Sequence, residues 1–263
     1  MGLIALTLYG VGDMLGGGVY GLVGRAAREM GNGIWLAMLT SAVAAVLTGL
    51  SYASLGARHP RAGGAAYITH RAFNIRFLSY MVGLAVLASG LLSMATNTQN
   101  FAGQFRGFDW AVPPWAIMLG FIAALSLVNF IGIRESTWLN ILCTVIEVAG
   151  LMFVVVVGLS YWGRADLLDF RAPANPSGAF SAPLLFTGAV VTFFSFLGFE
   201  DMLNVAEETK NPERVFPWAV ALSILIATLI YVAIAITAVS VVEVRDLADP
   251  NNKSPLVDVV RVA

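Results

Sequence analysis

Charged residues are scarce in this chain of 263 residues, since only 12% are Asp, Glu, Lys or Arg while 58% are hydrophobic. Soluble domains carry about 25% charged residues, so the composition predicts an integral membrane protein. The net charge of -1 shows no basic bias, and we expect no nucleic-acid partner. The one cysteine, Cys143, excludes an internal disulfide. Because it lies in an apolar segment, we expect its thiol to be buried and unreactive.

The chain contains long stretches with little or no charge. A helix needs roughly 20 apolar residues to cross about 30 Å of hydrocarbon, and seven segments approach or exceed that length. All look helical, so the predicted fold class is an all-α membrane protein. The segments are residues 3–24, 29–58, 76–106, 109–134, 137–162, 182–199 and 214–243.

The basic residues predict an orientation in the membrane. The loop between the second and third segments holds Arg58, Arg61, Arg71 and Arg76 without any acid, whereas the loops on the opposite side mix eight Arg or Lys with eight Asp or Glu. Counts of basic residues alone do not decide between the two sides, but this density places the N-terminus in the cytoplasm. We expect a multi-pass protein of the plasma (inner) membrane.

Two segments contain features that interrupt a helix. Residues 9–24 include seven glycines and Asp13, and the sixth segment contains Gly198 followed by two acids. The first and sixth segments cross in opposite directions, as do the interrupted helices of transporters built from inverted repeats. We therefore expect a first repeat at residues 1–162, an external loop at 163–182, an incomplete second repeat at 183–243, and an external loop with a short helix at 244–263.

Three stretches resemble the amino acid–polyamine–organocation (APC) permease superfamily: VGDMLGGGVYGLVG at 11–24, YASLGARHPRAGGAAY at 52–67, and FSFLGFEDMLNVAEETKNPERVFPWAV at 194–220. The resemblance implies the LeuT-type fold, with helices 1 and 6 discontinuous. It also implies a secondary active transporter of amino acids or related amines, working by alternating access and either proton-coupled or an exchanger. A chain that stops after helix 7 would be truncated, and we expect a fragment.

Backbone groups freed at the two breaks are the candidate ligands of the substrate. Amides at residues 16–18 would meet a carboxylate, because a helix N-terminus carries partial positive charge. Carbonyls at residues 195–197 would meet the ammonium, with phenylalanines closing over it. Small residues at this spacing are also typical of tight helix packing. The predicted substrate-binding residues are Gly16, Gly17, Gly18, Tyr20, Ser93, Ser195, Phe196, Leu197, Gly198 and Phe199.

Acidic residues within the segments are candidates for binding a coupling ion or proton. An ionised side chain at the membrane centre costs about 2.5–3.5 kcal/mol, so each requires a partner, a proton or a role. Glu147, Asp13 and Glu200 are the candidates. Glu147 resembles in position the helix-5 lysine of some proton-coupled members, from which this sequence departs. A hydrogen-bonded glutamate in helix packing is an equal alternative.

Two other functions compete with transport. A receptor or sensor with seven spans would fit the segment count but gives the two antiparallel breaks no purpose. An intramembrane enzyme would need catalytic groups within the segments, yet His59 and His70 both fall in a predicted loop. We therefore expect no catalytic residues, no metal site and no cofactor. The expected partners are an amino acid or amine, the bilayer and protons.

Overall fold

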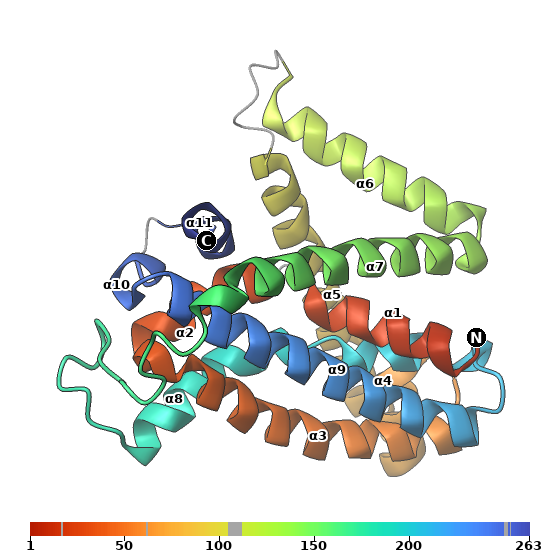
Figure 1. Cartoon of the computed structure of the whole chain (residues 1–263). Coiled ribbons are helices and arrows are strands. Elements are labelled where there is room, and N and C mark those ends of the chain that lie inside the picture. Colours follow the sequence, from red (N-terminus) through yellow and green to blue (C-terminus); the bar gives the residue numbers. More distant parts are fainter. Residues whose placement is uncertain (17, 62, 105–111, 250–251, 253) are drawn as a thin grey trace.

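The computed structural model describes residues 1–16, 18–61, 63–104, 112–249, 252 and 254–263 (Figure 1). The regular elements of these residues are all helical, as the sequence predicts. They are α1 (Leu3–Leu15), α2 (Gly18–Met30), η1 (Gly31–Gly33), α3 (Ile34–Arg58), α4 (Gly64–Phe73), α5 (Arg76–Gln104), α6 (Pro114–Ile131), α7 (Ile133–Gly158), η3 (Leu159–Tyr161), α8 (Ala182–Phe193), η4 (Phe194–Phe196), η5 (Phe199–Glu208), α9 (Pro212–Val241), α10 (Val244–Leu247) and α11 (Pro255–Val262).

Six stretches of the described residues are long and apolar enough to cross a membrane, which fits a multi-pass membrane protein. The sequence predicts seven, and the difference arises at the N-terminus. A break leaves α1 with 13 residues, about 20 Å at 1.5 Å per residue, which is short of the hydrocarbon thickness. Beyond the break, α2 continues through the single turn η1 into α3, so residues 19–58 form one long apolar stretch.

Helix α9 lies at the centre of the packed core, with α1 and α7 on one side and α3 on the other (Figure 1). It begins at Pro212, where the missing N–H of proline costs no helical hydrogen bond. Its buried residues recur along most of its length, and no charge falls between Arg214 and Glu243. The central helix thus offers apolar contacts to several neighbours at once.

Small residues let α3 approach α9 closely. A methyl group placed on Gly49 would overlap the side chain of Ile224, and one placed on Gly56 would overlap the ring of Phe216. Both partners are buried on α9. Without a hydrophobic driving force between helices in lipid, close packing over small residues is what holds such a pair together.

Helix α6 stands apart from this core, and α5 runs behind it in the same view (Figure 1). They pack mainly against each other, against α4 at one end and against α7 at the other, and α6 has no buried residue. The middle of α5 is likewise exposed. These two apolar helices therefore present faces that the described residues leave uncovered.

Two predictions about single residues are wrong. Cys143 is exposed, because it lies on the face of α7 that turns away from α1, whereas its neighbour Thr144 is buried against Gly12. His70 lies within helix α4 and not in a loop. An apolar setting in the sequence predicted burial for Cys143, but in a membrane protein an apolar face can also meet lipid.

Candidate functional site: the junction of two helix breaks

The first break separates α1 from α2 at the predicted position. Helix α1 ends at Leu15, and Gly16 leaves the helical conformation with φ -38° and ψ -170°. Helix α2 begins at Gly18, and the intervening Gly17 lies outside the described residues. The carbonyls at the end of α1 and the first amides of α2 consequently lack the helical partners that a continuous helix would give them.

The second break interrupts the membrane segment formed by α8, η4 and η5. Leu197 is extended, with φ -65° and ψ 140°, and Gly198 has φ 130°. An L-residue other than glycine rarely adopts that φ. The N–H of Gly198 donates to the carboxylate of Glu200 at 2.8 Å, so this acid caps η5 at its first turn.

The two breaks meet at Gly198. A Cβ on this glycine would lie 2.6 Å from the carbonyl carbon and oxygen of Asp13, and 2.9 Å from the backbone nitrogen of Met14. Real side chains do not approach backbone atoms so closely, so only glycine fits. The missing side chain therefore brings the unwound part of the sixth predicted segment against the last turn of α1.

Tyr231 of α9 joins the two breaks from the other side. Its hydroxyl donates toward the carbonyl oxygen of Ser195 at 2.6 Å and also lies against the carbonyl of Met14. The ring is fully buried and stands edge-on to Phe196, with centroids 5.1 Å apart and planes at 89°. The hydroxyl has one proton, which it shares between these two carbonyls or gives to one at a time, so a single phenol links the two breaks.

Acidic side chains gather on the Asp13 side of the junction. The side chains of Asn140, Asp201 and Glu200 all lie close enough to the Asp13 carboxyl to interact with it electrostatically. The second oxygen of Asp13 is buried and has no hydrogen-bond partner among the described residues, and the same holds for the hydroxyl of Ser195. Buried polar atoms ordinarily have partners, so the junction can accept further donors.

The predicted binding residues do not all lie in one place. Ser195, Phe196 and Gly198 lie at the junction with Gly16. Phe199 is buried beside them, edge-on to Tyr52 at 5.6 Å. By contrast, Leu197 is partly exposed.

Tyr20 and Gly18 belong to the beginning of α2, and the Tyr20 side chain is 39% exposed. Glu147 of α7 is half-buried and close enough to interact electrostatically with Tyr20 and Tyr231. Ser93 lies apart, exposed on α5, the helix whose main neighbours are α4 and α6. The structure thus brings together most of the predicted residues but leaves Ser93 on an outer helix.

Sequence reasoning missed Tyr231 and Asn140. Each carries a signal that could have revealed it, because a polar side chain inside an apolar membrane helix needs a hydrogen-bond partner. Tyr231 stands in the middle of an uncharged run of α9, and Asn140 lies one turn before Thr144 on α7. The sequence alone does not indicate which partner either side chain contacts, because the contacts depend on the packing of helices distant in sequence.

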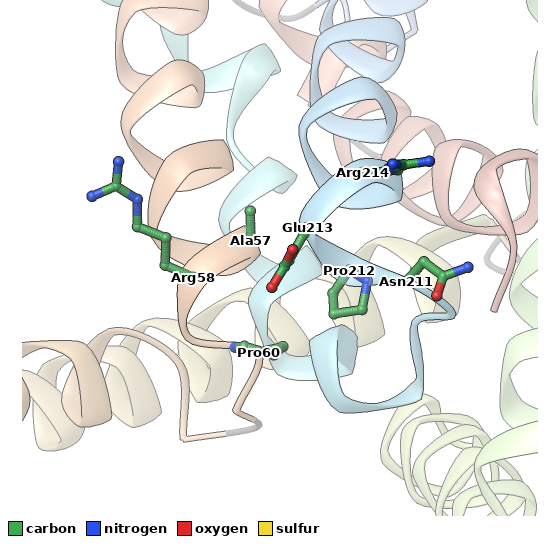
Figure 2. Close-up of a pocket in the computed structure, with 7 residues that line it drawn as sticks. All are labelled: Ala57, Arg58, Pro60, Asn211, Pro212, Glu213 and Arg214. Carbon is green, nitrogen blue, oxygen red and sulfur yellow. The ribbon is translucent and has the colours of Figure 1, made fainter.

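A separate cavity of about 410 Å³ lies where α3 ends and α9 begins (Figure 2). Figure 2 shows Arg58 and Arg214 pointing away from each other, with Glu213 between them. The two guanidinium groups do not converge on one ligand, so this cavity adds nothing to the junction described above. It is lined by Ala57, Arg58, Pro60, Asn211, Pro212, Glu213 and Arg214.

Comparison with known proteins shows which proteins this chain resembles in sequence. A family model described as amino acid permease matches residues 1–262. The chain is 32% identical, over 92% of its length, to cationic amino acid transporter 9 (chloroplastic) of Arabidopsis thaliana, and 33% identical, over 88%, to cationic amino acid transporter 4 of Mus musculus. It is 29% identical, over its whole length, to an uncharacterized transporter of Mycobacterium tuberculosis. It spans 45%, 39% and 57% of these three relatives, respectively.

Proposed function

Because the chain belongs to the amino acid permease family of the APC superfamily, we propose that it contains the substrate site of a secondary active transporter for amino acids or related amines. The observation that carries the proposal is the contact between two interrupted membrane segments at Gly198 and Asp13. Interrupted helices that meet near the membrane centre are where transporters of this kind bind their substrates. The same proposal assigns residues 1–162 to a first repeat, 163–182 to an external loop, 183–243 to an incomplete second repeat, and 244–263 to an external loop with a short helix.

Backbone groups recognise the amino acid in this proposal. The substrate carboxylate approaches the first amides of α2, near Gly16 and Gly18, where the helix dipole favours an anion. Gly17, outside the described residues, belongs to the same proposed site. The substrate ammonium faces the carbonyls that follow η4. The buried Ser195 hydroxyl, which has no partner among the described residues, is available to either group.

The acids at the junction suit a cationic side chain. Asp13, Glu200 and Asp201 interact electrostatically with one another, and a positively charged substrate group relieves their mutual repulsion. Relatives named cationic amino acid transporters support this choice. We therefore propose lysine- or arginine-like amino acids as the preferred substrates.

We propose that Glu147 binds the proton whose movement is coupled to substrate transport, with Asp13 and Glu200 as further candidates. Glu147 is half-buried on a membrane helix, and it has no ion-pair partner among the described residues. A carboxyl in that setting favours carrying a proton over an isolated charge. Glu147→Gln is expected to abolish stimulation of uptake by an inward proton gradient while substrate exchange continues.

The proposed location is the plasma (inner) membrane, with the N-terminus in the cytoplasm. The loop with Arg58, Arg61, Arg71 and Arg76 would then lie inside, in agreement with the positive-inside rule. Cysteine labelling with a membrane-impermeant reagent tests the orientation. A cysteine at Ser177 should react from outside in intact cells, whereas one at Ala72 should react only after permeabilisation.

Uptake by proteoliposomes tests the function. The complete protein should take up labelled arginine in a saturable way, and unlabelled lysine should compete for it. Gly198→Leu, which places a side chain against the backbone of α1, should abolish uptake, while Gly150→Leu, at an open position, should retain it. Saturable binding without uptake would contradict transport and favour a receptor.

A further inference from the structure

The corner between α4 and α5 concentrates positive charge at one edge of the molecule. Residues 58–77 contain four arginines and no acid. Asn74, with φ 53°, ends α4 in the left-handed conformation and turns the chain into α5. This tight turn places Arg71, in the last turn of α4, close in the chain to Arg76, the first residue of α5, and both are exposed.

Neither of these two arginines is neutralised within the described part of the chain. The ion pairs that the structure shows join Arg61 to Glu207 and Arg261 to Asp258, each at 3.7 Å. The first turn of α5 contains no acidic residue, although helix N-termini favour negative charge. Arg76 therefore adds a positive charge to the positive end of a helix of 29 residues, an arrangement that an external anion would stabilise.

Apolar side chains surround the same corner. Phe73, Ile75 and Phe77 are 62%, 51% and 73% exposed, and they alternate with the polar Asn74 and with Arg76 along the chain. Exposed aromatic and aliphatic residues beside basic ones are typical of elements that lie in the membrane interface. A soluble anion would meet the charges alone, whereas a phospholipid offers acyl chains to the phenylalanines as well.

We propose that the α4–α5 corner, consisting of Arg71, Phe73, Ile75, Arg76 and Phe77, binds the headgroup of an anionic phospholipid. The phosphate lies between the two guanidinium groups and the first amides of α5, and the acyl chains pack against the exposed apolar side chains. This site is separate from the junction of the helix breaks, and it does not depend on whether the protein transports amino acids.

Native mass spectrometry of the purified protein, titrated with phosphatidylglycerol or phosphatidylcholine, tests the proposal. The wild type should bind phosphatidylglycerol more tightly, and the double substitution R71Q/R76Q should weaken that binding about 30-fold, from about 1 kcal/mol for each basic residue at a membrane surface. R71K/R76K should keep most of the preference, because lysine retains the charge. Soluble glycerol phosphate should not displace the lipid.

The matched control removes two arginines from the proposed external loop, residues 163–182. R164Q/R171Q changes the net charge equally and should leave the preference for phosphatidylglycerol intact. Equal binding of the two lipids by the wild type, or an unchanged preference in R71Q/R76Q, would overturn the proposal. Displacement by glycerol phosphate would instead identify a soluble anion as the ligand and also overturn it.

Discussion

At the scale of single residues, Tyr231 is the side chain that ties the two helix breaks together. Its hydroxyl contacts carbonyl groups of Met14 and Ser195, which lie 181 positions apart in the chain by their numbering. Carbonyls without partners are costly inside a membrane, where water is absent. A single phenol thus stabilises an interruption that the backbone alone would not tolerate.

Replacement of Tyr231 by phenylalanine is expected to destabilise the protein by about 1–3 kcal/mol, the cost of leaving a buried acceptor without its donor. The ring contact with Phe196 remains in this variant, so the change isolates the hydroxyl. Thermal unfolding of the purified protein in detergent measures the loss. Tyr161→Phe is the control, since its hydroxyl bonds the carbonyl of Val262 in an exposed position, and it should change stability little.

Asp13→Asn tests whether the carboxyl group of Asp13, as distinct from the size of its side chain, matters at the junction. The substitution keeps the shape of the side chain but removes one of three neighbouring carboxyl groups. We expect the affinity for arginine to fall roughly tenfold, which corresponds to about 1.4 kcal/mol, while binding of neutral amino acids persists. Competition against labelled arginine measures the change.

Because Asp13 is close to two other acids, the same variant should be as stable as the wild type or more stable. Asp246→Asn removes an acid exposed near the C-terminal end and serves as the control, with unchanged affinity. Equal loss of arginine and of neutral substrates in Asp13→Asn would show that the carboxyl serves the structure and not selectivity.

At the scale of helices, the sequence predicts much of the architecture. Charged residues mark most segment ends, and the glycine cluster and Gly198 mark both breaks at the positions where the structure interrupts the helices. Both signals are local, because they depend on backbone conformation and on the cost of charge in lipid. The short α1 and the continuous run from α2 into α3 were not predicted, because the charged residues Arg25, Arg28 and Glu29 indicated a segment boundary where α2 in fact stays helical as far as Met30.

Contacts between helices were less predictable than the helices themselves. That Tyr231 contacts both breaks, and that Asn140 lies near Asp13, follows from packing between segments far apart in sequence. The burial predicted for Cys143 from its neighbours in the sequence was also wrong, because this residue is exposed. A membrane segment is apolar on all sides, so its sequence says little about which face meets protein.

The α3–α9 pair offers a test of packing at the level of helices. Gly56→Leu places a large side chain against Phe216, and overpacking of this kind costs typically 1–3 kcal/mol. A lowered unfolding temperature is expected. Gly120→Leu on α6, where nothing lies within 4 Å, is the matched control and should leave the temperature nearly unchanged.

At the scale of the whole molecule, a packed core around α9 contrasts with α6, which projects from it (Figure 1), and with α5, which packs mainly against α4 and α6. The core contains residues of both breaks and the buried aromatic residues, and the acids lie beside the junction. The chain spans less than half of the length of the two cationic amino acid transporters it was compared with. This chain nevertheless contains both proposed halves of the substrate site, and it brings them into contact.

Equilibrium binding of labelled arginine to the purified protein tests most directly whether the junction of the breaks is the substrate site. Wild type and Gly150→Leu should bind saturably and should be displaced by lysine. Gly198→Leu, if still folded by its thermal unfolding profile, should not bind. Undiminished arginine binding by folded Gly198→Leu would contradict the assignment of the site to the contact between Gly198 and Asp13.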